Sequence, residues 1–407
     1  MSKKRNKTKP IRYDKKRKTD MQKCSETPEA VQFLQAPTID LSQVVSLAPL
    51  DPLVIRSARP FDGQAGVDAA RLPPPSSLAG CLRTAWAESE DLPFDEALLQ
   101  QQVAGPLLLR GNSLLLPKPA DALYFGEGKS LICVRAAPRP FDEGCGSDLQ
   151  AELCPVQLEQ PCRGKSGNGP LWWTFADWCS FRHGSTLSGQ QLHDNGWSPP
   201  EGDLRTHVAI DNQRDAAAPG KLFQTEGLDL SASPQPLAAG MRLLARFAQP
   251  LGSRLVHLGG KRRLAALQPE SECIWPAPPA NWLEQIARQQ GVSLTLITPA
   301  LFSEGYRPGW LDRQLCGSPP GIPALRLRLQ GVAVERWQPH SGWDLAACKP
   351  RATRKLVPAG SVYWFRVEQG DTASLSQLWL ASLCDQSQDC RDGFGLALPA
   401  PWSPITL

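Results

Sequence analysis

The chain has 407 residues, of which 41% are hydrophobic, and carries a formal net charge of +4. This length predicts two packed domains rather than one. No run approaches the roughly eighteen apolar residues that span a bilayer, and the charged N-terminus lacks the apolar core of a signal peptide. We therefore expect a soluble, cytoplasmic protein with no membrane partner.

The positive charge is concentrated at the N-terminus. Residues 1–20 hold ten Lys or Arg against two Asp, a charge of +8, so the remaining residues carry −4. We expect residues 1–40 to form a basic disordered tail, which either attracts RNA nonspecifically or only aids solubility. In the body, any nucleic-acid site must be a local basic patch.

The first predicted elements are a strand at residues 53–55 and a helix that begins near Leu78. Three prolines, residues 73–75, fix φ ahead of two serines that can cap the helix, and further arginines follow the strand or project from another helix face. Free N–H groups and the helix dipole favour an anion there, although an ordinary strand, loop and helix with solvated arginines gives the same pattern. The candidate residues are Arg56, Arg59, Ser76, Ser77 and Arg83.

Further strands are indicated at residues 107–109, 114–116 and 131–134, followed by an insertion at about 136–205. Aromatic residues are dense between Trp172 and Phe181. They could stack on bases, but because aromatic side chains dominate core burial, we interpret them as a small core of the insertion.

Residues 206–230 are predicted to form a long hairpin, with apolar alternation in its first strand and a turn at Pro219-Gly220. Its candidate RNA-contacting side chains are His207, Asn212, Gln213 and Arg214, although a plain surface hairpin fits the pattern too.

A second unit begins near residue 236, with helical periodicity at residues 282–290 and 375–383 and strand character between them. It holds the densest basic patch of the body, where two glycines permit close backbone approach to a ligand and the cations suit phosphate oxygens, although a solvated turn fits the pattern too. A glycine-rich stretch near the C-terminus could turn its N–H groups to a phosphate. The candidates are Gly259, Gly260, Lys261, Arg262, Arg263, Arg391, Gly393 and Gly395.

No residue pattern indicates a cofactor or a metal. The 12 cysteines lack a CxxC pair, and the spacings of Cys145, Cys154 and Cys162 do not fit a zinc knuckle. A P-loop is rejected because Glu159 stands where its first glycine belongs. His193-Asp194 resembles a phosphohydrolase dipeptide, but no other histidine lies at metal-site spacing.

Five segments in order resemble the RAMP family of CRISPR effector proteins, in particular the family of third subunits of the type III-B, or Cmr, complex. They are the R-x-x-R-P-F to LPPPSSLAGCLR stretch, RTHVAID at 205–211, GKLFQTEGL at 220–228, LGGKRRL at 258–264 and RDGFGLAL at 391–398. The order of these motifs, rather than any single one, carries the resemblance.

The resemblance implies an α+β fold with two ferredoxin-like (RRM-like) domains, residues 41–235 and 236–407, each built on a β-α-β-β-α-β pattern. It further implies that the hairpin is a thumb against the guide RNA, that the glycine-rich loop lies on RNA, and that the chain is a noncatalytic subunit. The implied partners are the 5′ tag of the guide (crRNA), a large Cas-ten-type subunit and the backbone RAMP subunits, with target RNA contacted indirectly. Two alternatives stay open: a metal-independent RAMP endoribonuclease with His207 as general base, and the equivalent RAMP subunit of another type III complex.

Overall fold

The computed structural model describes residues 43–55, 70–150, 153–231, 240–344 and 349–405, with side chains left out at residues 129, 219–221, 343–344 and 349–350. All of these fall in one unit, residues 35–407. The predicted basic tail, Arg56 and Arg59 lie outside the described residues. The division of residues 41–407 into two domains stays a prediction.

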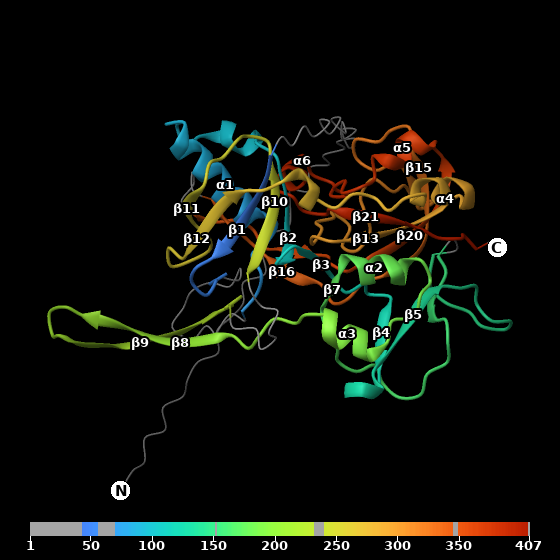
Figure 1. Ribbon diagram of the computed structural model, residues 1–407, viewed down its shortest axis with the longest axis horizontal. Helices are drawn as coiled ribbons and strands as arrows, with labels where there is room; N and C mark the ends of the chain where they lie inside the picture. The colour runs from blue at the N-terminus through green and yellow to red at the C-terminus, as the bar shows by residue number, and fades with distance from the viewer. Residues whose placement is uncertain (1–42, 56–69, 151–152, 232–239, 345–348, 406–407) are drawn as a thin grey trace, which may run out of the picture. The chain divides into compact units, whose positions relative to one another are not determined.

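The largest sheet has seven antiparallel strands in the order β11-β12-β1-β10-β2-β3-β7 (Figure 1). Its strand before the first helix lies at Gln43–Pro49, whereas the expected strand at residues 53–55 forms only one bridge, from Leu53 to Leu228. The strands are β1 (Gln43–Pro49), β2 (Val103–Arg110), β3 (Ser113–Pro117), β7 (Trp172–Thr174), β10 (Met241–Phe247), β11 (Arg254–His257) and β12 (Leu264–Pro269).

Helix α1 (Pro75–Ser89) covers this sheet through its buried face. Leu78, Leu82 and Ala85 recur at helical spacing and pack in one cluster with Leu47 of β1 and Leu108 of β2. The 3₁₀ helix η1 (Glu96–Gln100) then leads into β2.

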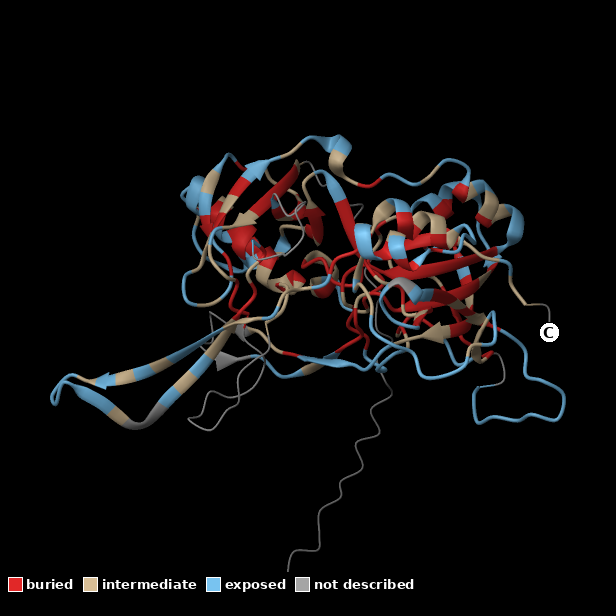
Figure 2. Ribbon diagram, turned by 60° about the horizontal axis from the view of Figure 1, so that its bottom comes forward, coloured by how far each residue is buried: buried red, intermediate tan, exposed pale blue. Residues whose placement is uncertain are grey.

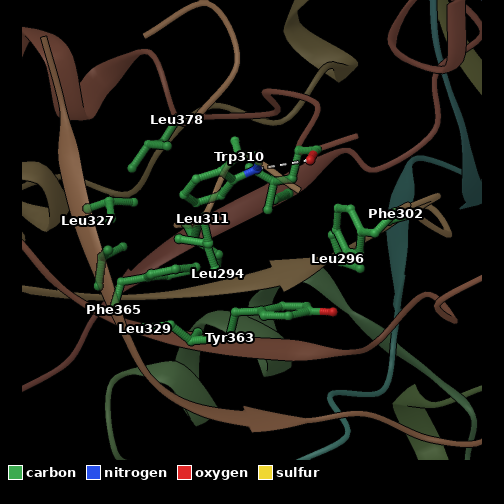
Figure 3. Packing of buried hydrophobic residues seen from close by; sticks show 14 of the residues in the cluster. Leu294, Leu296, Phe302, Trp310, Leu311, Leu327, Leu329, Tyr363, Phe365 and Leu378 are labelled. Carbon is green, nitrogen blue, oxygen red and sulfur yellow. Dashed lines mark hydrogen bonds between the residues drawn. The ribbon is translucent and has the colours of Figure 1, made fainter. Parts of the chain in front are cut away.

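The second sheet has the order β14-β15-β20-β13-β21, again antiparallel. Figure 3 shows its core, where Trp310 stacks on Phe365 with ring centroids 5.7 Å apart. The indole of Trp310 donates to the Leu383 carbonyl at 3.2 Å. Its elements are η3 (Glu272–Ile274), α4 (Trp282–Gln289), β13 (Gly291–Leu296), β14 (Cys316–Gly317), β15 (Arg326–Ala333), β20 (Val362–Gln369), α5 (Thr372–Ser376), α6 (Ser387–Arg391) and β21 (Ala397–Pro401).

A third, smaller sheet, β4-β5-β6, lies with two helices below the second sheet in the view of Figure 1. Trp173, Trp178 and Phe181 are at most 2% exposed, so these three side chains are core. Trp173 and Phe181 pack together as predicted, whereas Trp178 packs with residues outside the insertion, such as Leu107 and Trp282. The core around Trp173 already includes Ala122 and Tyr124, upstream of the predicted start of the insertion. Its elements are β4 (Ala122–Phe125), η2 (Gly128–Ser130), β5 (Ile132–Pro138), β6 (Val156–Leu158), α2 (Phe175–Arg182) and α3 (Gly189–Asn195).

Three two-stranded ribbons complete the described fold: β8 (Asp203–Asp211) with β9 (Ala216–Gly227), β16 (Gln338–His340) with β19 (Arg354–Leu356), and β17 (Trp343–Asp344) with β18 (Lys349–Pro350). The expected helix at residues 375–383 is wrong, because α5 ends at Ser376 and turns follow. None of the described helices is long and apolar enough to cross a membrane. The architecture is thus a mixed α+β fold of antiparallel sheets.

Candidate nucleic-acid interface

The β8–β9 hairpin extends away from the sheets as a long two-stranded ribbon (Figures 1 and 2). Its turn covers residues 212–215, so the expected turn at Pro219-Gly220 is wrong and both residues lie inside β9. Proline is tolerated there because each strand of an isolated hairpin has an unpaired edge. Asn212, Gln213 and Arg214 are exposed at the tip, where Asp211 accepts from the Gln213 N–H at 3.0 Å.

The two faces of the hairpin differ in chemistry because side chains alternate along each strand. Large apolar side chains on one face are exposed: Leu204, Val208, Ile210 and Leu222. The other face carries His207 directly opposite Phe223 in the register, and their rings stack with centroids 5.1 Å apart at 21°. His207 Nε2 also lies 2.9 Å from the Thr225 hydroxyl.

The basic turn at residues 258–263 lies beside this aromatic face. Lys261 Nζ is 4.8 Å from the centre of the Phe223 ring, so a lysine, a phenyl ring and an imidazole form one continuous stack. Lys261 and Arg262 are exposed, with left-handed φ values of 61° and 53°. Arg263 is more enclosed and pairs with Asp51 at 3.7 Å.

The glycines of this turn hold it against residues 53–55 and leave little backbone for a ligand. Gly260 donates its N–H to the Val54 carbonyl at 2.7 Å. At Gly259, where φ is +82°, a Cβ would lie 2.9 Å from the same carbonyl oxygen. The Gly260 N–H is therefore used inside the protein and is not open to a ligand, against the expectation, and the cationic side chains remain as the groups that face solvent.

Residues 53–55 also join the root of the hairpin. Leu53 and Leu228 exchange two backbone hydrogen bonds of 2.8 Å, and both side chains are fully buried. The predicted strand region, the hairpin and the basic turn, which are far apart in the sequence, thus meet at one place. We call His207, Phe223, Lys261 and Arg262 the hairpin-root surface.

The N-terminus of α1 differs from the prediction. The helix begins at Pro75 with Pro74 as N-cap, and neither Ser76 nor Ser77 supplies a capping hydrogen bond. Pro75 has no N–H to satisfy, which reduces the need for a side-chain cap. Both serines are half-buried, and Ser76 Oγ lies 3.5 Å from Nε2 of His340, a residue of β16.

Arg83 was expected to project outward, and this is wrong. The residue is 5% exposed, and its guanidinium donates to Asp392 Oδ1 at 2.6 Å and to the carbonyls of Gln101 and Arg391. Arg83 and Asp392 are both buried, and charged side chains are almost never buried unless they are paired. Arg83 therefore ties α1 to the loop after α6 and does not offer a charge to solvent.

The glycine-rich loop at residues 391–395 is likewise used internally. The Gly393 N–H donates to Cys390 O at 3.1 Å and the Gly395 N–H to Pro299 O at 2.8 Å, so the prediction of N–H groups turned toward a phosphate is wrong. A Cβ on Gly393 would lie 2.7 Å from the Gly105 carbonyl oxygen. Arg391 is partly exposed at the edge of this loop.

A basic segment at residues 335–356 was missed. It holds five Lys or Arg against two acidic residues, a signal visible in the sequence. Trp337 is 48% exposed, and Lys355 Nζ lies 5.3 Å from its ring. Arg354 is paired with Asp389, whose pKa burial raises despite that contact.

Among the described residues, no group of three or more His, Cys, Asp or Glu side chains is gathered in a way that could hold a metal ion. The imidazole of His207 is committed to a ring stack and a hydroxyl contact. The hairpin-root surface offers cationic and aromatic side chains, which suit the phosphates and bases of single-stranded nucleic acid.

Comparison with known proteins gave one family and several solved structures. The family described as "CRISPR-associated protein (Cas_Cmr3)" matches residues 45–402. No curated protein matches the chain. A chain in the cryo-EM structure of the type III-B Cmr-beta complex bound to cognate target RNA and AMPPnP is 14% identical, with 79% of this chain and 86% of that chain covered and a TM-score of 0.45. A chain in the cryo-EM structure of type III-B Cmr-beta bound to cognate target RNA gives 15% identity, the same coverage and a TM-score of 0.45. A chain in the Csm3-Csm4 subcomplex of a type III-A complex gives 10% identity, coverage of 89% and 100%, and a TM-score of 0.37.

Proposed function

Because the chain belongs to the Cas_Cmr3 family of CRISPR-associated proteins and is a type III CRISPR effector subunit of the RAMP type, we propose that it holds the 5′ tag of the guide RNA. In this role it positions RNA and performs no chemistry. The guide would lie on the hairpin-root surface, with the hairpin bending or kinking the strand as it leaves.

The observation that carries this proposal is the stack of Lys261, Phe223 and His207 beside exposed Arg262. Cations next to aromatic rings bind single strands by combining phosphate neutralisation with base stacking. The exposed residues at the hairpin tip, including Arg214, extend the same contact away from the body.

We propose two ferredoxin-like units as the scaffold. In the first sheet, strands β1, β2, β10 and β12 stand in the order β12-β1-β10-β2, which is the fourth, first, third and second strand of such a unit. In the second sheet, β13, β15, β20 and β21 repeat this order as β21-β13-β20-β15. The hairpin and the aromatic insertion would then lie between the second and third strands of the first unit.

The proposed partners follow from the family. They are the large Cas-ten-type subunit and the backbone RAMP subunits, with target RNA reached only through the guide. The apolar face of the hairpin, with Leu222 62% exposed, supports a protein contact in the assembled complex, because unpartnered apolar surface favours association.

The test is the salt dependence of RNA binding. The full chain is titrated with a labelled single-stranded RNA that carries the repeat-derived tag, at several salt concentrations, and compared with a variant in which Lys261, Arg262 and Arg263 are changed to Ala. Each lost phosphate contact should lower the logarithmic slope by about 0.7. The control for the loss of a single charge elsewhere is Arg288→Gln, on α4, which Figure 1 draws away from the hairpin. An unchanged slope in the triple variant would remove this surface from the proposal.

A further inference from the structure

A second exposed aromatic residue with a lysine beside its ring lies on the β16–β19 ribbon. Trp337, just before β16, is 48% exposed, and Nζ of Lys355, on β19, lies 5.3 Å from the centre of its ring. This pair resembles Lys261 and Phe223 at the hairpin root, where the corresponding distance is 4.8 Å. Because nearly half of the Trp337 side chain faces solvent, it is open to a ligand.

The inner face of the ribbon holds this pair in place. His340 and Leu356 are 7% and 3% exposed, and the His340 ring packs edge-on against Phe394 with centroids 5.3 Å apart. Lys355 stands one position before Leu356 on β19 and is exposed. Since side chains alternate between the two faces of a strand, the ribbon is anchored through one face and presents its cation on the other.

The charge around Trp337 is positive. Arg336 and Arg351 are exposed, and no ion pair to either is found among the described side chains. The Arg351 N–H donates to the Gly342 carbonyl at 2.8 Å, so this arginine continues the ribbon beyond β16. The acidic neighbour, Glu335, lies 3.7 Å from Lys118, which offsets its charge. A ligand at the indole therefore meets cations on both strands of the ribbon.

These features favour a nucleic-acid strand over an apolar protein face. In the described part of residues 335–356, Trp337 is the one large apolar side chain that is exposed. Protein-binding patches gather contiguous apolar surface, whereas a base needs only one ring to stack on and its phosphates need cations nearby. The combination of a lone exposed indole with unpaired cations thus matches single-stranded RNA.

We propose that Trp337 and Lys355, with Arg336 and Arg351 beside them, form a second contact for single-stranded RNA. A base stacks on the indole, and the cations hold the neighbouring phosphates. The proposal rests on the proposed function in taking the ligand to be RNA, but this contact reads no sequence, because every base offers a ring face.

The decisive comparison keeps apolar bulk and removes the aromatic ring. The full chain is titrated with labelled single-stranded RNA and followed by fluorescence anisotropy. Trp337→Leu should bind at least about fivefold more weakly than the wild type, the lower end of the effect of one base stacked on a ring. Trp337→Tyr, which keeps a ring, should retain most of the affinity. Lys355→Gln should lower the logarithmic salt slope by about 0.7.

Tyr306→Leu is the matched control for the loss of an exposed ring. Tyr306 is 47% exposed and lies outside the basic segment, so this variant should bind RNA as the wild type does. Equal affinities of Trp337→Leu and Tyr306→Leu would overturn the proposal. An affinity of Trp337→Tyr as low as that of Trp337→Leu would also overturn it, because the ring would then not be what binds.

Two RNAs separate this contact from the tag site. One carries the repeat-derived tag, and the other has the same length and composition in scrambled order. The proposed function requires that the wild type prefer the tag, whereas Trp337→Leu should weaken both RNAs to the same degree. If the wild type binds both equally, the tag function fails and the Trp337→Leu comparison still decides this contact.

The remaining outcomes count against the proposal. If the wild type prefers the tag and Trp337→Leu binds both RNAs as tightly as the wild type, this contact is refuted while the tag function stands. Unchanged RNA binding together with the loss of a neighbouring subunit from the purified complex would make Trp337 a protein contact instead. Absence of binding by either RNA would overturn both proposals.

Discussion

Replacing Arg83 by Met should cost the fold about 3–5 kcal/mol, because it leaves a buried carboxylate without its cation. The guanidinium donates to Asp392 at 2.6 Å, twice to the Gln101 carbonyl at 2.7 and 3.0 Å, and to the Arg391 carbonyl at 3.2 Å. With Arg83 gone, Asp392 keeps one side-chain donor, Gln388 Nε2 at 2.8 Å. One neutral donor does not replace a buried positive charge.

Urea unfolding followed by the fluorescence of the 13 tryptophans measures this loss. Arg83→Met combined with Asp392→Leu should recover much of the stability, since the uncompensated charge is removed. The exposed control Arg288→Met should change the free energy of unfolding by no more than about 0.5 kcal/mol. A loss below about 1 kcal/mol for Arg83→Met would refute the buried role, and a lower RNA salt slope for Arg83→Lys would return the residue to the RNA surface.

Three further predictions concern separate parts of the molecule. Burial and nearby arginines lower the pKa of His340 from 6.5 to about 4. Its contribution to the free energy of unfolding is therefore fully present above pH 6.5 and falls by roughly 3 kcal/mol as the pH drops toward 4. His340→Gln should flatten this pH dependence, which urea unfolding measures. Phe223→Ala should weaken RNA binding, because it removes the ring that Lys261 and His207 flank, and an unchanged Kd would contradict the stack as a binding surface. Among the cysteines of the described residues, native alkylation followed by mass spectrometry should modify exposed Cys145 and Cys273 first and leave Cys384, whose thiol pKa burial raises, unreacted until unfolding; early modification of Cys384 would contradict its burial.

Sequence patterns correctly predicted those elements that depend on neighbouring residues alone. The alternation in residues 206–210 predicted a strand of the hairpin, which is present. The run Lys261, Arg262, Arg263 predicted a basic patch, and Lys261 and Arg262 are exposed in a turn. The position of the hairpin turn was missed because Pro219-Gly220 is a stronger local turn signal than residues 212–215, yet the edges of an isolated hairpin accommodate it within β9.

Contacts between residues far apart in the chain determine the features that the sequence patterns did not predict. Arg83 and Asp392 are 309 residues apart, and nothing near Arg83 in the sequence marks it as buried. Residues 391–395 have the composition of a phosphate-binding loop, but the close approach of Gly393 to the Gly105 backbone explains why a glycine stands at position 393. His340 and Ser76 meet across 264 residues, so their contact could not be predicted from the sequence, although the basic composition of residues 335–356 is visible there.

The central claim is that this chain holds the tag of a guide RNA. The most direct measurement is to express the chain with its neighbouring subunits and a CRISPR array, purify the assembly through this chain, and sequence the bound RNA from its 5′ ends. The account predicts short RNAs that share one repeat-derived 5′ tag, and their depletion when Lys261, Arg262 and Arg263 are changed to Ala. RNAs with unrelated 5′ ends, or no RNA at all, would contradict it.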